Sequence, residues 1–375
     1  MASFIKERLR QARELRGLTK TSLSMLSQVS VMSLSHYESG TREPRQDSLT
    51  RLANALSLPE SFFCKPMPDR LETPVYFRAL RRQKKIFQEQ WEQHSALLDE
   101  LLDEILNYVD IPKLNIPQLS LGEHWATVEK NKIEQAAYKT RELLGLKFGP
   151  IPNMIKLLEN NGCLVVRLDM DSSEDGFSRW LHGGTIPVVF LSKNTTAYRD
   201  RMSMAHELGH LVLHRHITPA DTNLKIIEEQ AWLFASAFLM PEKGYARDFS
   251  YASLDTFRIL KQKWKISIAA QVRRCLQLNI ISEQAHKNIQ INLSRKGWRT
   301  CEPYDETTPL EAPNLLEASA DIIFKQLCIS LEQISNLGAL DVIRLLGLEQ
   351  TYFDRIGDER ILPKNKILKF TKYEK

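Results

Sequence analysis

The chain has 375 residues, of which 43% are hydrophobic, and it carries 51 Lys and Arg against 46 Asp and Glu. This composition excludes a collagen-like, low-complexity or wholly disordered chain, and the length suits two or three domains with separate cores. The formal net charge of +5 permits binding to nucleic acid but does not by itself argue for it.

Cysteine usage and hydropathy favour a protein of the reducing cytoplasm. The five cysteines are far apart and form no C-x-x-C pair, so neither a disulfide framework nor a cysteine zinc site is expected: Cys64, Cys163, Cys275, Cys301 and Cys328. No apolar run reaches about 18 residues, so we expect no transmembrane helix. The opening residues are charged almost at once and lack an apolar signal segment. We therefore expect a cytoplasmic protein with no membrane partner.

The amino-terminal part is predicted to contain short helices with tight turns, over residues 8–15, 19–26, 30–39 and 48–56. Thr19 and Ser30 are placed to cap the second and third helices, and Gly40 to end the third. Leu49, Leu52, Ala53 and Leu56 give the fourth helix one buried face. A boundary is expected at the two prolines that follow residue 65.

Beyond this boundary the sequence predicts an α+β arrangement. A charged helical stretch over residues 80–107 is predicted to connect the domains and could form a homodimer contact. Helices are then expected over 131–144 and 151–160, and strands over 163–168 and 186–191. The glycines between the two strands indicate a hairpin or an exposed loop. The chain is predicted to be helical again from residue 197, and a helical tail to begin near 315.

The sharpest chemical signal is the run His206-Glu207-Leu208-Gly209-His210. On a helix, positions i and i+4 face the same side, so the two imidazoles can bind one Zn²⁺. Glu207 stands where a carboxylate can reach a metal-bound water as the general base. The flanking residues are largely apolar, and charged residues on a buried helix need partners, which a metal supplies. The run therefore predicts a zinc site with Glu207 as the catalytic residue.

The third protein ligand needs a separate choice. His216 follows His210 at the metzincin spacing, but that pattern requires Gly where this chain has Leu213. His214 lies one turn beyond His210, and three histidines along one straight helix span about 12 Å, too far for one ion. We therefore expect both to lie outside the ligand set.

The following helix, over residues 226–240, offers two carboxylates. At about 100° per residue, its buried face is formed by Ile227, Ala231, Phe234, Ala235 and Phe238. Glu228 lies at the edge of this face beside small alanines, which would let the two helices approach closely, and Glu229 points almost the opposite way. We predict Glu228 as the third ligand and keep Glu229 as the alternative. Two His and one Glu leave open the position that a catalytic zinc requires.

Five motifs follow one another between residues 130 and 305. They are Gly176-Phe-Ser-Arg-Trp, Pro187-Val-Val-Phe-Leu, Arg199-Asp-Arg-Met-Ser-Met-Ala-His-Glu-Leu-Gly-His-Leu-Val-Leu-His214, Glu228-x-x-Ala-x-x-Phe-Ala-x-x-Phe-Leu-Met-Pro241 and Trp264-Lys-Ile-Ser-Ile268. In this order they resemble the ImmA/IrrE metallopeptidases. The resemblance implies a zinc endopeptidase that cuts DNA-binding repressors in phage, mobile-element or stress circuits. It also implies His206, His210 and Glu228 as ligands and Glu207 as the base.

The segment from Leu18 to Pro44 resembles the Xre/Cro-type helix-turn-helix. Its matching positions are Leu23, Leu26, Val29, Leu34, Glu38, Gly40, Arg42 and Pro44. It departs from that pattern at Lys20, Ser24 and Gln28, where the family usually has Gln, Ala and Gly. The resemblance implies a five-helix fold whose recognition helix begins near Val31 and faces the major groove.

The expected recognition face is weak in groups that read bases. It offers Val31, Met32, Ser33, Ser35 and His36 and none of the Arg, Asn or Gln side chains that pair bidentately with G or A. Lys20, Arg42 and Arg45 are predicted to contact phosphates. The alternative is a helical module that binds another protein, such as a related repressor.

Together these features predict a multi-domain, mainly α protein. The expected domains are a helix-turn-helix over 1–67, a helical connector over 68–130, a gluzincin-like zinc peptidase with a small sheet over 131–305, and a helical tail over 306–375. The favoured function is a DNA-associated regulatory endopeptidase that cuts a repressor, an antitoxin-like protein or its own linker near 66–80. The alternative is a transcription regulator or antitoxin whose zinc fold is a sensor without proteolysis. His182 and Tyr198 are candidate oxyanion donors that are also expected to have structural roles.

Overall fold

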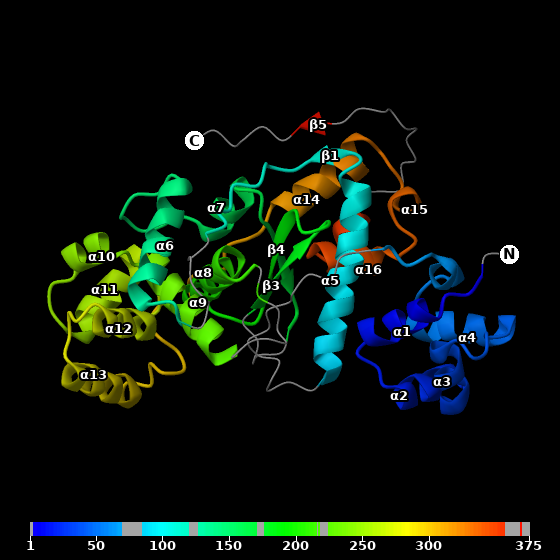
Figure 1. The fold of residues 1–375 in the computed structure, drawn as a ribbon, viewed down its shortest axis with the longest axis horizontal. Helices are drawn as coiled ribbons and strands as arrows, with labels where there is room; N and C mark the ends of the chain where they lie inside the picture. Colours follow the sequence, from blue (N-terminus) through cyan, green and yellow to red (C-terminus); the bar gives the residue numbers. More distant parts are fainter. Residues whose placement is uncertain are drawn as a thin grey trace. The chain divides into compact units, whose positions relative to one another are not determined.

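The computed structural model describes residues 3–69, 85–119, 127–170, 176–215, 217, 224–356 and 368–369. They fall into two compact units, one taken from residues 3–111, 315–356 and 368–369 and the other from residues 112–314. The chain is mainly helical with a small three-stranded sheet, which confirms the expected fold class (Figure 1). Among the described helices, none combines the length and the apolar character needed to cross a membrane.

The first unit begins with the helix-turn-helix. Its elements are α1 (Lys6–Leu15), α2 (Lys20–Ser27), α3 (Val31–Ser39), α4 (Gln46–Leu56) and the 3-10 helix η1 (Glu60–Cys64), so the expected five helices are present. Thr19 Oγ1 accepts a hydrogen bond from the Ser22 N–H, and Ser30 Oγ accepts one from the Ser33 N–H. Gln28 has a φ of +57° between α2 and α3, so it adopts the left-handed turn at the position where Gly is usual.

A buried ion pair joins α1 to α3. Arg13 Nε donates to Glu38 Oε1 at 2.6 Å and Arg13 Nη2 to Oε2 at 3.1 Å, with 10% and 5% of the two side chains exposed. Lys20 Nζ lies 3.6 Å from the same carboxylate. The pair fixes the recognition helix against the first helix through bidentate geometry.

Replacing Glu38 by Gln is expected to destabilise the helix-turn-helix by about 1–3 kcal/mol, because it removes the bidentate partner of the buried Arg13 guanidinium and leaves the Glu14 carboxylate, at 3.3 Å, as its remaining counter-charge. Amide hydrogen exchange of the full chain should show lost protection in α1 and α3. Glu43→Gln, at an exposed position of the same module, is the matched control. Equal protection in the two variants would show that the pair contributes little.

The rest of the first unit surrounds a long helix. This helix, α5 (Lys85–Ile105), packs against α1, α15 (Leu331–Ile334) and α16 (Ala339–Leu346). The fully buried Arg8 Nη1 donates to Glu100 Oε1 of α5 at 2.7 Å, and Arg16 Nη1 donates to Asp341 Oδ1 of α16 at 2.6 Å. The remaining elements are α14 (Leu315–Ala320), the π-helix η4 (Asp321–Gln326), α17 (Tyr352–Ile356), and β1 (Val109–Asp110) parallel to β5 (Leu368–Lys369). The carboxy-terminal helices therefore belong to the same compact unit as the helix-turn-helix.

The second unit contains a sheet covered by helices. Its elements are α6 (Lys130–Leu143), α7 (Met154–Asn160), β2 (Leu164–Leu168), β3 (Gly176–Leu181), β4 (Ile186–Ser192), α8 (Ala197–Leu213), α9 (Leu224–Leu239), α10 (Glu242–Asp248), α11 (Leu254–Trp264), α12 (Ile268–Gln277) and α13 (Glu283–Arg295). The strand order is β2-β4-β3, with β2 parallel and β3 antiparallel to β4. The predicted hairpin between the two strands thus contains β3, which forms one edge of the sheet.

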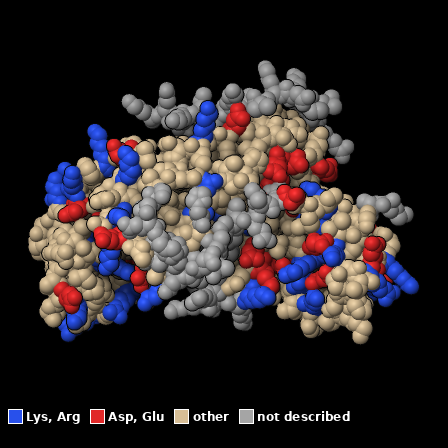
Figure 2. Space-filling model, in the orientation of Figure 1, with Lys and Arg blue, Asp and Glu red and all other residues tan. Residues whose placement is uncertain are grey.

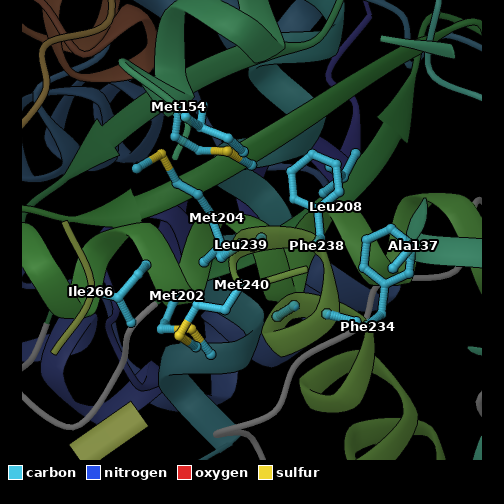
Figure 3. Packing of buried hydrophobic residues seen from close by; sticks show 14 of the residues in the cluster. Ala137, Met154, Met202, Met204, Leu208, Phe234, Phe238, Leu239, Met240 and Ile266 are labelled. Carbon is cyan, nitrogen blue, oxygen red and sulfur yellow. The ribbon is translucent and has the colours of Figure 1, made fainter. Parts of the chain in front are cut away.

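The core of this unit lies where α8 and α9 pack on each other. Figure 3 shows Met202, Met204 and Leu208 of α8 among Phe234 and Phe238 of α9. A Cβ at Gly209 would lie 3.1 Å from Phe234 Cδ1 and 3.2 Å from the Ala231 carbonyl oxygen. The two helices therefore approach each other closely next to the His and Glu residues identified above, as the small alanines had suggested.

Buried ion pairs fix the start of α8. Arg167 of β2 and Asp200 of α8 form a bidentate pair, with nitrogen–oxygen distances of 2.6 and 3.1 Å. Arg201 pairs with Glu311, whose carboxylate also accepts hydrogen bonds from the first amides of α7. Residues 306–314 consequently belong to the second unit. The domain limit at residue 305 stays a prediction.

Candidate metal centre

Two helices bring together three potential metal ligands. His206 and His210 are one turn apart on α8, Glu228 is near the start of α9, and their donor atoms all lie within 4.8 Å of one another. The Nε2 atoms of the two histidines are 3.0 Å apart. Glu228 Oε2 is 3.3 Å from His206 Nε2, and Oε1 is 3.5 Å from His210 Nε2. Both imidazoles are almost completely buried, and 21% of the Glu228 side chain is exposed.

These separations fit a zinc ion. A tetrahedral ion with bonds of 2.0–2.1 Å holds neighbouring donor atoms about 3.3–3.4 Å apart, close to the distances within the cluster. Two imidazole nitrogens and one carboxylate are also a donor set that zinc accepts in catalytic sites. The three residues could therefore hold zinc without a large rearrangement.

The cluster favours an ionised Glu228 and excludes Glu229. Burial raises the pKa of Glu228, but hydrogen bonds and charge from His206 and His210 outweigh it and lower that pKa far below its ordinary value. Glu229 points to solvent, where its carboxylate lies 4.0 Å from Lys225 Nζ. The alternative ligand from the sequence is thus not brought into the cluster.

A hydrogen-bonded chain behind His210 determines which of its nitrogens carries the proton. His214 is buried, and burial together with the charge of His210 lowers its pKa to about 3, so its ring is neutral. Its Nε2 lies 3.0 Å from Gln230 Oε1, an acceptor, and its Nδ1 lies 3.0 Å from His210 Nδ1. His214 therefore donates from Nε2 and accepts at Nδ1, so His210 donates from Nδ1.

When the His210 ring is neutral, this arrangement leaves its Nε2 lone pair directed at the cluster, as a metal ligand requires. His214 accordingly lies behind His210 and outside the cluster. His216 falls outside the described residues. The sequence indicated that His214 would not coordinate, but the contact with Gln230 was not predictable, because it depends on the relative rotation of α8 and α9.

Glu207 is held by a residue that the sequence analysis did not single out. Ser178 Oγ, on β3, donates a hydrogen bond of 2.7 Å to Glu207 Oε2, and both side chains are buried. Ser178 is the central residue of the Gly176-Phe-Ser-Arg-Trp motif. The motif was part of the resemblance, but only the fold shows that β3 lies against the Glu207 side of α8.

The two candidate oxyanion donors lie at the start of α8 and in the turn between β3 and β4. Tyr198 is buried, its hydroxyl lies 2.9 Å from Thr308 Oγ1, and its ring is covered by Lys261 Nζ at 4.1 Å. His182 is exposed in the turn between β3 and β4, with a φ of +50°. The contacts of Tyr198 indicate a structural role.

The helix-turn-helix presents the predicted DNA-contacting residues in different environments. Val31, Met32, His36, Arg42 and Arg45 are exposed, whereas Ser33 and Ser35 are half-buried. Lys20 is partly engaged by Glu38, and Ser33 Oγ accepts a hydrogen bond from Ser30 Oγ. On the face of the molecule in Figure 2, the region of α2 and α3 shows few charged side chains.

Two family models match the chain. Residues 158–276 match the IrrE N-terminal-like domain of a peptidase family, and residues 9–63 match the helix-turn-helix. A search of curated proteins found no match. The first match includes α8, α9 and β3, and hence Ser178, Glu207 and the three residues of the cluster. The chain therefore combines a segment similar to a helix-turn-helix domain with a segment similar to an IrrE N-terminal-like domain.

Proposed function

We propose that the protein is a zinc-dependent endopeptidase with a regulatory role. The observation that carries the proposal is the convergence of His206, His210 and Glu228 beside Glu207. The first three residues form a donor set that suits zinc and leaves one position open, and Glu207 supplies a general base.

The proposed chemistry assigns each side chain a separate task. Zinc bound by the cluster would lower the pKa of a water molecule and polarise a peptide carbonyl. Glu207 takes the proton of the attacking water and returns it to the leaving amine. Ser178 orients the Glu207 carboxylate, and the hydrogen-bonded pair of His214 and Gln230 orients His210.

The sheet offers a place for an extended substrate. β3 is an edge strand that pairs with β4 on one side and, among the described residues, with no strand on the other. A peptide can add to such an edge through main-chain hydrogen bonds. Because Ser178 belongs to β3, a peptide bound along this edge would lie next to Glu207.

The helix-turn-helix is proposed to bring the peptidase to DNA. Arg42 and Arg45 are exposed and would contact phosphates, with Lys20 as a weaker third contact because of its pairing with Glu38. The proposed substrate is a repressor or antitoxin-like protein bound near the same site. The protein would then act where its substrate is concentrated.

Zinc content tests the metal centre. The wild-type chain is expected to bind one equivalent of zinc, Glu228→Ala to lose it and Glu229→Ala to keep it, because only Glu228 lies beside the histidines. Elemental analysis of the three purified proteins provides the measurement. A chelator should stop peptide cleavage by the wild type, and added zinc should restore it.

The two glutamates make a matched pair, since they are adjacent and have the same chemistry. If zinc were lost from Glu229→Ala alone, the third ligand would be Glu229 and the assignment to Glu228 would be wrong. Failure of the wild type to take up zinc from solution would contradict the proposed function.

The second candidate is a regulator that binds a protein through its helix-turn-helix and cuts nothing. It is favoured by four large exposed apolar side chains on α2 and α3: Met25 (72%), Leu26 (60%), Val31 (41%) and Met32 (71%). Exposed large apolar side chains that lie close together are typical of protein interfaces. Measuring the affinity for duplex DNA at several salt concentrations separates a DNA-binding from a protein-binding helix-turn-helix. Phosphate contacts give an affinity for DNA that falls steeply with salt, and an apolar interface for a protein does not.

A further inference from the structure

A pocket of about 290 Å³ lies beside the candidate metal centre, within the second unit. It is lined by α8 through Arg199, Met202 and Ser203, and by α9 through Trp232. The Trp232 ring also contacts the His206 ring, with centroids 4.3 Å apart. The pocket therefore adjoins the cluster, with Trp232 as their shared wall.

The helical register places the pocket in line with the proposed ligands. Arg199, Met202 and Ser203 precede His206 by seven, four and three residues, so all four project from one face of α8. Arg199 is about 10.5 Å from His206 along the helix axis. An extended peptide advances about 3.3 Å per residue, so the pocket is within about three residues of a bond cut at the cluster.

The charge of the pocket is positive. Arg199 and Arg273, the latter from α12, are exposed lining residues, and neither forms an ion pair with any described carboxylate. Among the described residues, no Asp or Glu lines the pocket. The nearby cations are different, because Arg167, Arg201 and Arg274 pair with Asp200, Glu311 and Glu134.

A carboxylate at the start of α12 is already neutralised. Glu302 accepts hydrogen bonds from the amides of Ile268 and Ala269 and from Lys261 Nζ. It is buried and does not compensate the two arginines. The pocket thus combines an apolar wall of Met202 and Trp232 with two guanidiniums that no carboxylate of the described residues neutralises.

We propose that this pocket binds a carboxylate of the peptide substrate and makes the enzyme prefer an acidic residue near the cut. The proposal rests on the endopeptidase function given above. Arginine suits this role because its planar guanidinium binds a carboxylate bidentately and stays charged at any working pH. The apolar wall would contact the methylene carbons of an Asp or Glu side chain. A terminal carboxylate of a peptide has the same chemistry and must be distinguished by experiment.

The first experiment uses the zinc-loaded full chain and a synthetic mixture of random nonapeptides, prepared with free and with amidated carboxyl termini. Mass spectrometry of the products should show Asp or Glu enriched about tenfold at one fixed position, within three residues of the cut, the size of effect expected of a hydrogen bond between charged groups. Enrichment that survives amidation identifies a side-chain carboxylate. Cleavage at a fixed distance from a free carboxyl terminus, lost on amidation, identifies the terminal group.

Substitutions connect the preference to the two arginines. The double variant Arg199→Gln/Arg273→Gln should lose the enrichment, and Arg199→Glu/Arg273→Glu should replace it by a preference for Lys and Arg, which a merely misfolded protein would not show. Arg295→Gln removes an exposed arginine of α13 that does not line the pocket, and should leave the enrichment unchanged. An acidic preference that persists in the double Gln variant, or that is missing from the wild type, would overturn the proposal.

A binding measurement keeps this test separate from the peptidase test. Immobilised full-length Glu207→Gln protein should retain acidic nonapeptides from the amidated mixture, and the same protein with both arginines changed to Gln should not. If no variant cuts any peptide while acidic peptides are still retained through the arginines, the endopeptidase function fails and the pocket stands. If peptides are cut but retained without regard to charge, the pocket fails and the function stands.

Discussion

Replacing Glu207 by Gln is expected to lower the rate of peptide cleavage by about 10²–10⁴-fold while leaving the zinc content unchanged. A general base contributes a factor of this size, and the amide of Gln cannot take the proton of the attacking water. Gln keeps the shape of Glu and can still contact the Ser178 hydroxyl, so the packing of α8 on β3 should persist. Cleavage of a peptide mixture and elemental analysis, both on the same preparation, give the two measurements.

Two further variants make this result specific. Glu229→Gln removes an exposed carboxylate of α9 and should cleave at the wild-type rate. Ser178→Ala should cleave more slowly than the wild type but faster than Glu207→Gln, because it affects only the orientation of the base. Wild-type cleavage by Glu207→Gln would exclude Glu207 as the base. Regulation that continues unaltered in that variant would favour the sensor without proteolysis.

The spacing of residues along single helices was sufficient to predict the candidate ligands. His206 and His210 share a face because four residues make about one helical turn, and the same angular argument put Glu228 at the inner edge of its helix and Glu229 outside. The structure places these residues accordingly. The cap residues were equally predictable from the sequence, since Thr19 and Ser30 accept hydrogen bonds from amides only three positions away. Local geometry of this kind needs no knowledge of the tertiary fold.

Contacts between distant segments were not predictable in the same way. Ser178 reaches Glu207 across 29 positions, and His214 meets Gln230 across 16, through the packing of β3 and α9 on α8. The pocket arginines are more widely separated still, and Arg199 and Arg273 carry no sequence signal that distinguishes them from the paired arginines nearby. A single sequence gives the residue types, but only the packing shows which cations have partners.

The carboxy-terminal tail illustrates the same difference. Its apolar helical pattern indicated core or dimer contacts, and the structure packs α15 and α16 against α5 within the first unit.

One consequence concerns His94 of α5, a residue that the sequence did not distinguish from other histidines. His94 is 7% exposed and lies beside the Trp91 ring, and within the described part of the chain its Nδ1 has no hydrogen-bond partner. Burial, and to a lesser extent the charge of Arg344, lowers the pKa of His94 to about 3.

This shift predicts that the first unit loses stability in mild acid. Above pH 6.5, the ordinary pKa of His94, the residue is neutral in the folded and unfolded states and contributes no pH dependence. Between pH 6.5 and about 3, the unfolded chain binds a proton that the folded chain excludes, so the free energy of unfolding falls as the pH falls, by up to about 1.4 kcal/mol per pH unit. Between pH 7.5 and 5.0 the loss due to this residue is about 2 kcal/mol.

His94→Leu, an apolar replacement of similar size, should remove this contribution. Urea titrations at pH 7.5 and 5.0, read by pulse proteolysis with mass spectrometry of fragments from residues 85–105, report on the unit that contains α5. The stability of His94→Leu relative to the wild type should rise by about 2 kcal/mol between the two pH values. His36→Leu, at an exposed position of the same unit, should show no such rise. A difference between His94→Leu and wild type that is the same at both pH values would mean that the folded protein accommodates the charged imidazole, and that acid acts on this unit through other groups.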